Sequence, residues 1–294
     1  MSHVEIRPAR ADDRDVVLAF CANTWEWGDY VAYVWDEWLN DPSGALLVAV
    51  VDDLPVGIAH MQMLTASDAW LEGLRVDPTF RQQGVGSALN IACMEEAMKR
   101  GARYARLLTS SDNMASIAMV ERLFWRRVGS FVSFSAEPMA ALSEREVGPD
   151  LPRLATAADS DDITNYLNSS NIMPLSGSLY YHNFTAYVIN DDLIKAKIDA
   201  GEVYALRRWQ RLDGFAFAEM LQGRQGSSLF IGYIDGTSEA ISLIAYALRK
   251  QAADMGIPHI RAHVPDMMMV RDAFVAAGYD WSGVLFYTFE RKLF

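Results

Sequence analysis

Cysteine is scarce in this 294-residue sequence, which contains only Cys21 and Cys93. Both lie in stretches with the periodicity of amphipathic helices, where a buried free thiol is the usual outcome. A disulfide framework and a zinc site built on cysteine are therefore excluded, and the sequence predicts no metal site of another kind.

Long apolar runs are missing as well, since no stretch approaches the roughly 20 residues that a membrane-spanning helix needs. The first residues, MSHVEIRPARADDRD, are charged throughout and lack the apolar core of a signal peptide. We therefore expect no membrane segment and a cytoplasmic location.

Positive charge is in deficit, because 26 lysines and arginines face 38 aspartates and glutamates, for a formal net charge of −12. Such a field repels the phosphate backbone of nucleic acids and attracts cations. Nucleic acid is thus a poor candidate partner and a cationic amine a better one, although solubility alone is the commoner reason for a charge of this size.

Apolar residues are abundant, at 51% of the chain. A single core stops growing near about 150 residues, so the length predicts two domains. Residues 138–152, with Ser143, Gly148 and Pro149 among alternating charges, have the composition of a linker. We expect domains at 1–137 and 153–294.

The first half has the periodicity of an α/β domain. Short apolar-rich runs predict strands and 3.6-residue patterns predict helices. The predicted strands cover 4–8, 44–51, 56–65, 70–76, 104–109 and 128–135, and the predicted helices cover 11–23, a segment ending at 38, 85–100 and 113–124. Because several strands follow one another through tight turns, we expect a mixed, mostly antiparallel central sheet flanked by helices.

The second half repeats the first. Ala11-Asp12-Asp13 matches Ala158-Asp159-Ser160 at an offset of 147 residues (158 − 11). Gly44 and Gly57 match Gly201 and Gly214 at an offset of 157, and the offset falls to 155 where Gly101 meets Gly256. The common order of these matches predicts the same fold twice. The second half lacks a few residues at the position of the glycine-bearing segment 77–84 of the first half.

A glycine-bearing loop at 77–84 separates the strand at 70–76 from the helix at 85–100. Gly84 and Gly86 remove side chains at the start of the helix, so its free backbone N–H groups and positive dipole end can meet an anion such as a diphosphate. Arg81 adds a positive charge. The loop has neither the first glycine of a dinucleotide fingerprint nor the Gly-Lys-Ser/Thr of a P-loop.

Arg81-x-x-Gly84-x-Gly86 after Leu74-x-Val76-x-Pro78 resembles the acetyl-CoA signature of the GNAT superfamily of N-acetyltransferases, over residues 4–136. Finer motifs, such as Leu71-Glu72-Gly73, are similar to the histidine N-acetyltransferase and aminoglycoside 6'-N-acetyltransferase groups. The resemblance implies tandem GNAT domains with acetyl-CoA as cofactor. The residues that it implies for cofactor binding are Leu74, Val76, Arg81, Gln82, Gln83, Gly84, Val85, Gly86, Ser87, Asn113 and Ser116.

Glu72 is the candidate catalytic base, since attack on a thioester needs a neutral amine and a carboxylate can remove its proton. A glutamate with purely structural hydrogen bonds is the alternative. The tyrosine that serves as acid in many members of the family falls on Val120 here. Ser116, another tyrosine or water remain as alternatives for that role.

The acceptor site is predicted in the aromatic and acidic segment after the first helix. Trp25, Glu26, Asp29 and Tyr30, with the neighbouring Trp27, combine aromatic faces with negative charge, which suits a cationic amine. Arg75 could pair with a substrate carboxylate. Packing and helix capping are the ordinary explanation for such a cluster, and both Arg75 and the nearby His60 could be structural.

The second half lacks the loop. Gly236-Thr237-Ser238-Glu239 stands in its place, and Ile231, which matches Glu72, cannot accept a proton. We interpret this half as a degenerate GNAT-like domain, which could shape the acceptor site or form a homodimer.

Three functions follow as hypotheses. The first is an enzyme that transfers an acetyl group from acetyl-CoA to the amine of a small molecule, such as an amino acid, by direct attack in a ternary complex. The second is a non-catalytic module that binds acyl-CoA or a small amine, and the third is a scaffold for protein partners. An intact loop next to a carboxylate favours the enzyme.

Overall fold

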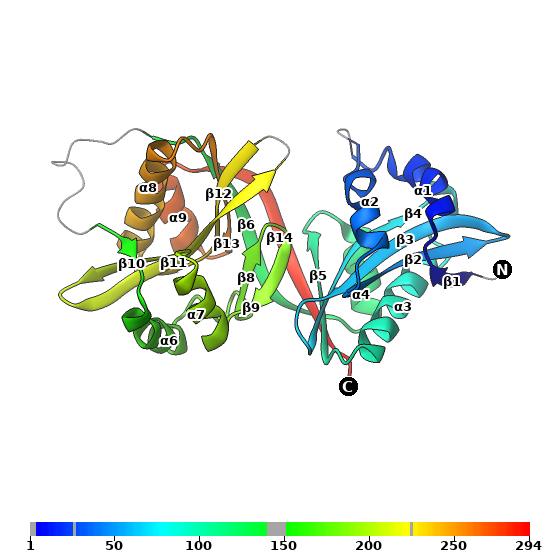
Figure 1. Ribbon diagram of the computed structural model, residues 1–294, viewed down its shortest axis with the longest axis horizontal. Helices are drawn as coiled ribbons and strands as arrows, with labels where there is room; N and C mark the ends of the chain where they lie inside the picture. Colours follow the sequence, from blue (N-terminus) through cyan, green and yellow to red (C-terminus); the bar gives the residue numbers. More distant parts are fainter. Residues whose placement is uncertain (1–3, 26–27, 140–150, 224–225) are drawn as a thin grey trace. The chain divides into compact units, whose positions relative to one another are not determined.

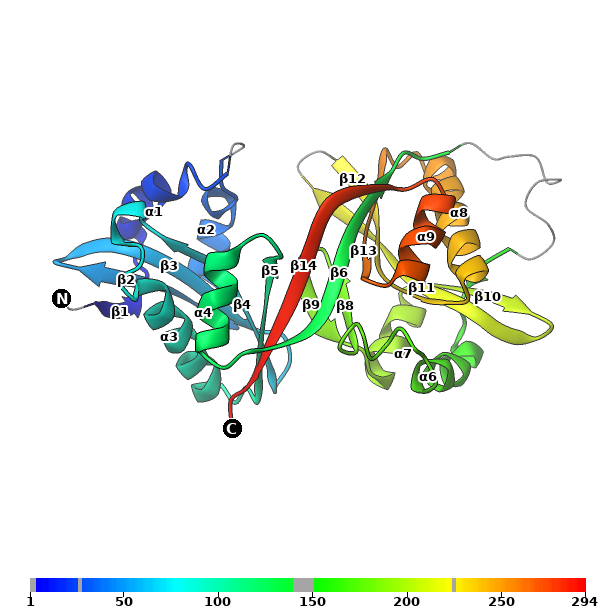
Figure 2. The same ribbon diagram turned by 180° about the vertical axis from the view of Figure 1, so that it is seen from behind.

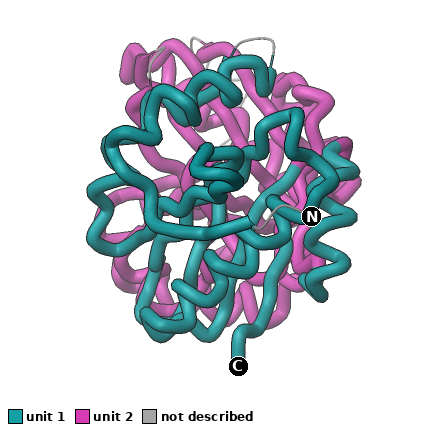
Figure 3. The backbone as a smooth tube through the Cα atoms, turned by 90° about the vertical axis from the view of Figure 1, so that its right-hand side faces the viewer, with its two compact units in different colours: residues 1–109, 113–126, 289–294 teal, residues 110–112, 127–288 magenta. Residues whose placement is uncertain are grey.

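The computed structural model describes residues 4–25, 28–139, 151–223 and 226–294. The chain forms two compact units (Figure 3). Unit 1 comprises Met1–Thr109, Asn113–Arg126 and Phe289–Phe294, and unit 2 comprises Ser110–Asp112 and Arg127–Thr288.

Unit 1 is built on an antiparallel meander followed by a parallel strand. Its elements are β1 (Glu5–Pro8), η1 (Ala11–Asp13), α1 (Arg14–Cys21), α2 (Val31–Leu39), β2 (Gly44–Val51), β3 (Leu54–Met63), β4 (Asp68–Val76), η2 (Pro78–Phe80), α3 (Val85–Lys99), β5 (Tyr104–Ser110) and α4 (Met114–Arg122). The strands are ordered β1-β2-β3-β4-β5. Only β4 and β5 pair in parallel, so the predicted mixed, mostly antiparallel sheet is confirmed.

Both faces of this sheet are covered, with α1 and α2 on one side and α3 on the other (Figure 1). One core contains Leu46, Val48 and Val50 of β2 together with Trp35 of α2. The intervening residues of β2 point to the opposite face, because side chains alternate along a strand. A strand buried on both faces is apolar throughout, which explains the continuous run of β2.

Unit 2 contains more strands of the 12-stranded sheet and has its own pair of cores. Its elements are β6 (Arg126–Ala136), β7 (Arg153–Leu154), η3 (Ala157–Asp159), α6 (Ser160–Asn168), β8 (Leu179–His182), β9 (Thr185–Val188), α7 (Asp191–Asp199), β10 (Val203–Arg208), β11 (Arg211–Gly223), β12 (Gly226–Gly236), α8 (Ser238–Asp254), β13 (His259–Pro265), α9 (Met268–Ala276) and β14 (Asp280–Lys292). The order in the sheet is β14-β6-β13-β12-β11-β10-β7, and β14 and β6 lie side by side (Figure 2).

The units do not divide the chain at one point. Although β6 directly follows α4, it pairs with β13 inside unit 2. The last residues of β14 return to unit 1, where Leu293 N–H donates to Arg103 O at 2.9 Å. The sequence-based limits of 1–137 and 153–294 follow the chain order and stay predictions, as does the linker, of which residues 140–150 lie outside the described part.

The repeat is visible in the contacts near the start of each half. Arg7 forms a bidentate pair with Asp13, and Arg153 forms the same pair with Asp159. Each aspartate also accepts a backbone N–H three residues before it. The two aspartates are 146 positions apart (159 − 13). The sequence match of this segment, which aligned the runs of acidic residues, gave an offset of 147. The offset in the structure is one residue smaller because the contacts to arginine, and not the runs of acidic residues, are what the two halves share.

Among the described residues, no helix is long and apolar enough to cross a membrane.

Candidate functional site

The strand β4 leaves its neighbour halfway along its length. Asp68–Trp70 pair in parallel with Tyr104–Arg106 of β5, and residues 71–76 continue beyond that paired stretch. Backbone N–H and C=O groups that leave a ladder are free to pair with another extended chain. The second half of β4 is thus an open edge that leads to the glycine loop.

A bulge in β4 accompanies this opening. The β3–β4 register shifts between Ile58, which faces Arg75, and His60, which faces Glu72. Gly73 lies inside the shift with φ at +66°, a conformation that favours glycine. A Cβ atom there would lie 2.4 Å from a ring carbon of Trp38, so glycine is also needed for space.

The loop after β4 is held by its own side chains. The Asp77 carboxylate accepts hydrogen bonds from Thr79 N–H at 2.8 Å and from its hydroxyl at 2.7 Å. Arg81, which is exposed, donates from Nε to the backbone oxygen of Val76 at 3.3 Å. Gln82 and Gly84 have φ values of +62° and +87°, and this left-handed turn brings the chain into α3.

The first turn of α3 is an uncapped helix N-terminus. Gly84 is the N-cap and supplies no side-chain hydrogen bond. The N–H groups of Val85, Gly86 and Ser87 have no partner within the helix, and the positive end of the dipole lies there. A Cβ atom on Gly86 would be 3.4 Å from Met119 Sδ, in ordinary van der Waals contact, whereas a Cβ atom on Gly84 would meet nothing within 4 Å, so the open side of this turn lies at Gly84. A diphosphate fits such a cradle.

Glu72 is half-buried on β4, and one of its oxygens lies within hydrogen-bond distance of two side chains. Oε1 lies 3.1 Å from His60 Nδ1 and 3.4 Å from Gln62 Nε2. His60 and Gln62 are two positions apart on β3 and therefore share a face. Sequence reasoning did not connect Gln62 or Asp41 with this site. The alternation His-x-Gln opposite a glutamate is a signal for Gln62, whereas Asp41 reaches His60 from a turn that only the structure places there.

The residues predicted for the acceptor are brought together around Arg75. Its guanidinium pairs with the buried Asp29 at 2.7 Å and lies over the rings of Trp25 and Tyr30, at 4.5 and 5.3 Å from their centroids. Burial is the largest single effect and opposes its charge, but the hydrogen bond to Asp29 and the neighbouring negative charges together outweigh burial and raise the pKa of Arg75. Burial raises the pKa of Tyr30 to about 12. Glu26 and Trp27 lie outside the described residues.

The third predicted group lies at the start of α4. Asn113 is its N-cap, and the side-chain oxygen accepts the N–H of Ser116 at 3.2 Å. Both residues are accessible, Asn113 fully and Ser116 in part. Val120 is completely buried, so the position where many GNAT members have an acidic tyrosine belongs to the core here.

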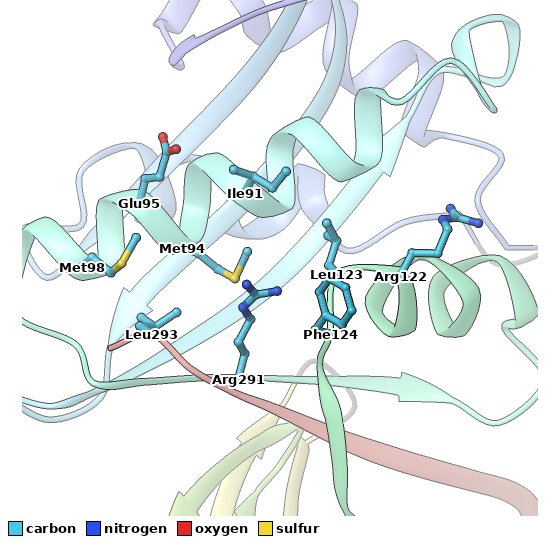
Figure 4. A pocket seen from close by; sticks show the side chains of 9 residues that line it. All are labelled: Ile91, Met94, Glu95, Met98, Arg122, Leu123, Phe124, Arg291 and Leu293. Carbon is cyan, nitrogen blue, oxygen red and sulfur yellow. The ribbon is translucent and has the colours of Figure 1, made fainter.

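Two hollows mark the surface of unit 1. One, of about 670 Å³, borders the loop and is lined by Asp15, Val16, Ala19, Phe20, Asn23, Asp77, Pro78, Thr79 and Arg81. The other, of about 340 Å³, is lined by Ile91, Met94, Glu95 and Met98 of α3, Arg122, Leu123 and Phe124 at the end of α4, and Arg291 and Leu293 (Figure 4). It contains neither Glu72 nor any loop residue.

The corresponding region of unit 2 is closed. A single residue, Thr237, connects β12 to α8, where unit 1 has eight residues, 77–84. The Thr237 hydroxyl caps the N–H of Ala240 at 3.2 Å, and Glu239 forms a bidentate pair with Arg208. A carboxylate therefore stands at the N-terminus of α8, where unit 1 offers bare N–H groups. Ile231, opposite Ala218, is fully buried.

Both cysteines are free and buried, as expected. Burial raises the pKa of each thiol to about 12, so neither is a nucleophile at neutral pH. Within the part of the chain that the structure describes, no group of three or more His, Cys, Asp or Glu side chains could hold a metal ion.

The mixed sheet opened at β4, the glycine loop and the uncapped helix α3 all lie in the part of the chain that a family model matches. Residues 16–124 match the model of the Acetyltransferase (GNAT) family. A curated relative, the L-2,4-diaminobutyric acid acetyltransferase of Nocardia farcinica (strain IFM 10152), is 27% identical over 129 residues, which cover 43% of this chain and 67% of the relative. Residues 16–124 are thus similar to the GNAT acetyltransferases.

Solved structures extend the likeness to the whole chain. A GCN5-related N-acetyltransferase from Sphaerobacter thermophilus superimposes with a TM-score of 0.64 at 12% identity, over 99% of this chain and 96% of the other. A tandem GNAT protein from the clavulanic acid biosynthesis pathway gives a TM-score of 0.53 at 13% identity, over 99% of both chains. These likenesses show the fold, and the predicted tandem arrangement of GNAT folds is confirmed.

Proposed function

We propose that this protein transfers the acetyl group of acetyl-CoA to the amine of a small molecule, in a ternary complex formed on unit 1. The observation that carries the proposal is the uncapped start of α3, which follows the opened strand β4 through the loop at 77–84. The N–H groups from Gln82 through Ser87 would hold the diphosphate, with Arg81 beside it. The open edge at Leu74 and Val76 would pair with the pantetheine arm.

Glu72 is the proposed base. It lies four residues before the end of β4, on the same strand as the proposed pantetheine contacts, and its side chain is 23% exposed. Bound acetyl-CoA supplies the acetyl group. Glu72 removes a proton from the ammonium form of the acceptor, because only the neutral amine has the lone pair that attacks a thioester.

For the acceptor we propose a small amino acid or a related amine. The named activity of the Nocardia relative supports this class, and so do the sequence motifs shared with the histidine and aminoglycoside acetyltransferase groups. The Asp29–Arg75 pair with Trp25 and Tyr30 forms the wall where such a molecule would lie. Because Asp29 already neutralises Arg75, we expect the acceptor to contact the aromatic faces of this wall rather than to form a new ion pair with it.

The proposal is tested by thiol release from acetyl-CoA with L-2,4-diaminobutyrate, L-histidine and an aminoglycoside as acceptors, with mass spectrometry of the product. Release that depends on one of these amines, with a mass gain of one acetyl group, supports it. Tight CoA binding with no release for any amine would favour a binding module instead, in keeping with the buried Val120. Absence of CoA binding would contradict both functions.

Glu72→Gln should lower kcat by about 10²-fold or more at neutral pH, because a neutral amide cannot accept the proton of the amine. CoA affinity in calorimetry should stay within about twofold, since no loop atom changes. Glu121→Gln, the same exchange at an exposed position of α4, serves as the control. Wild-type turnover of the Glu72→Gln variant would remove Glu72 from this role.

A further inference from the structure

His60 lies fully buried between two carboxylates. Its Nδ1 is 3.1 Å from Glu72 Oε1, and its Nε2, which makes no hydrogen bond of ordinary length, faces Asp41 Oδ2 at 3.5 Å. The ring is stacked on Trp38, with centroids 4.6 Å apart and planes 11° from parallel. A histidine in an apolar core would not need two acidic neighbours, so the arrangement calls for a reason beyond packing.

Two glycines make room for this stack. A Cβ atom on Gly44 would lie 2.2 Å from Asp41 Oδ2 and 2.8 Å from His60 Nε2. A Cβ atom on Gly73 would clash with Trp38, the residue that covers the His60 ring. Asp41 itself is fixed by Ser43, whose N–H and hydroxyl donate to Oδ1 at 2.8 and 2.7 Å. The chain of contacts therefore runs from a rigid turn through His60 to Glu72.

The two oxygens of Glu72 differ in consequence. Oε1 faces His60 Nδ1 and accepts from Gln62, whereas the contacts of the described residues leave Oε2 without a hydrogen-bond donor. A carboxylate that is held through one oxygen presents the other in a fixed direction, and catalysis by a base depends steeply on such placement.

We propose that His60, held by Asp41, is the positioning residue of the base: it holds Oε1 of Glu72 so that Oε2 takes the proton of the amine. In that step an N–H bond of the ammonium breaks and an O–H bond forms at Oε2. The nitrogen keeps the electron pair that attacks the thioester. This inference rests on the proposed function of Glu72.

Two substitutions of His60 test the role. An asparagine amide can occupy the place of Nδ1 and still donate to Glu72, whereas a glutamine amide occupies the place of Nε2. The acceptor is L-2,4-diaminobutyrate or another amine that the wild type acetylates. His60→Gln should lower kcat by about 10- to 100-fold with KM for acetyl-CoA unchanged. His60→Asn should keep most of the wild-type kcat. Equal losses in both variants, in parallel with their melting temperatures, would mean a structural role and would overturn the proposal.

A double-mutant comparison separates this inference from the proposed function. If His60 acts through Glu72, His60→Gln adds no further loss to Glu72→Gln. If the losses are additive, the positioning role of His60 is overturned and Glu72 remains the base. The same conclusion follows if His60→Gln has wild-type turnover while Glu72→Gln is defective. Wild-type turnover of Glu72→Gln removes the base, and the present inference with it.

Asp41→Asn keeps the test valid if the His60 variants do not fold, because Asp41 lies near the surface and does not contact Glu72. We expect a several-fold loss of kcat that vanishes in the Glu72→Gln background. An unchanged kcat contradicts the proposal. The proposal can also be tested without measuring turnover. A crystal structure of Asp41→Asn or His60→Gln should show the Glu72 carboxylate displaced from its position in the wild type. An undisturbed carboxylate contradicts the proposal equally.

Discussion

Gly84 and Gly86, at the start of α3, differ in what they require of the backbone. Gly84 has a left-handed backbone with open space where a Cβ atom would lie, so its requirement is conformational. Gly86 is already helical, and a Cβ atom there would make ordinary contacts with Met119, Val76 and Leu74. The structure gives Gly86 no conformational or steric reason to be glycine, so the proposed approach of a diphosphate makes it the sharper position for a test.

Gly86→Ala should weaken CoA binding by about tenfold or more, because the added methyl group keeps a diphosphate away from the N–H groups of the first turn. Protein stability should be unchanged or rise by about 0.5–1 kcal/mol, since alanine favours a helix over glycine. Calorimetric titration with CoA and thermal unfolding measure the two effects. Gly223→Ala, on β11, is the control. Wild-type affinity of Gly86→Ala would refute the loop as the CoA site.

Asp159 is the acidic residue of unit 2 whose ionisation is most strongly supported. The hydrogen bonds from Arg153, assisted by those from Thr156 and Arg207, outweigh burial and lower its pKa well below the usual range. A carboxyl group with a lowered folded-state pKa stabilises the fold above its unfolded pKa of about 4, and this contribution is lost as the pH falls.

Asp159→Asn should therefore destabilise the protein by about 1–3 kcal/mol at pH 7, with a difference from wild type that narrows between about pH 5 and pH 2. Thermal unfolding of both proteins across this range measures the effect. Asp161→Asn, which alters an exposed carboxylate in the next turn, should show no such narrowing. A constant difference at all pH values would mean that the charge of Asp159 is not what matters.

At the level of elements, the two halves differ in how strand and helix are joined. The eight residues between β4 and α3 leave a helix N-terminus bare, whereas the single residue between β12 and α8 caps its helix and places the Glu239 carboxylate beside it. At the start of α8 the Glu239 carboxylate would repel a diphosphate, whereas the bare N–H groups at the start of α3 would attract one.

Calorimetry should therefore give one CoA per chain, in spite of the repeated fold. The Gly86→Ala variant identifies the site. All CoA binding should be weakened in this variant, because the start of α8 provides no second site. A stoichiometry of two, or a tight site that persists in Gly86→Ala, would show that unit 2 binds CoA as well.

At the level of the whole molecule, the last residues of the chain complete the first unit. Arg106, 6% exposed, pairs with Asp68 and with Glu290, whose oxygen lies 2.7 Å from the guanidinium. Removal of one partner of a buried ion pair is strongly destabilising. Arg106 lies on β5, and the structure explains this arginine by its two ion pairs.

A chain that ends at Thr288 should therefore lose CoA binding and stability, even though the loop at 77–84 is intact and lies 205 residues (289 − 84) before the first residue removed. The expected loss in unit 1 is about 3–5 kcal/mol, the cost of leaving Arg106 without one carboxylate. A chain that ends at Leu293, without the exposed Phe294, is the control. Wild-type CoA affinity of the shorter chain would show that unit 1 folds without Phe289–Phe294.

Local patterns in the sequence were sufficient for the order of strands and helices, for the fold that occurs twice and for the glycine loop with its helix. Hydrophobic periodicity and helix-start signals depend on neighbours within a few residues, so they can be interpreted without a structure. Most predicted element ends in unit 1 lie within two residues of those observed, such as 44–51 for β2 and 85–100 for α3.

The tertiary structure alone decided which side chains meet. Arg75 pairs with Asp29, 46 residues earlier, and His60 lies between Asp41 and Glu72. These contacts depend on the register of β3 and β4 and on a bulge at Gly73, and a shift of one residue would turn each side chain to the other face. Likewise, the return of Phe289–Phe294 to unit 1 depends on which strand edges meet in space, and local periodicity carries no information about that choice.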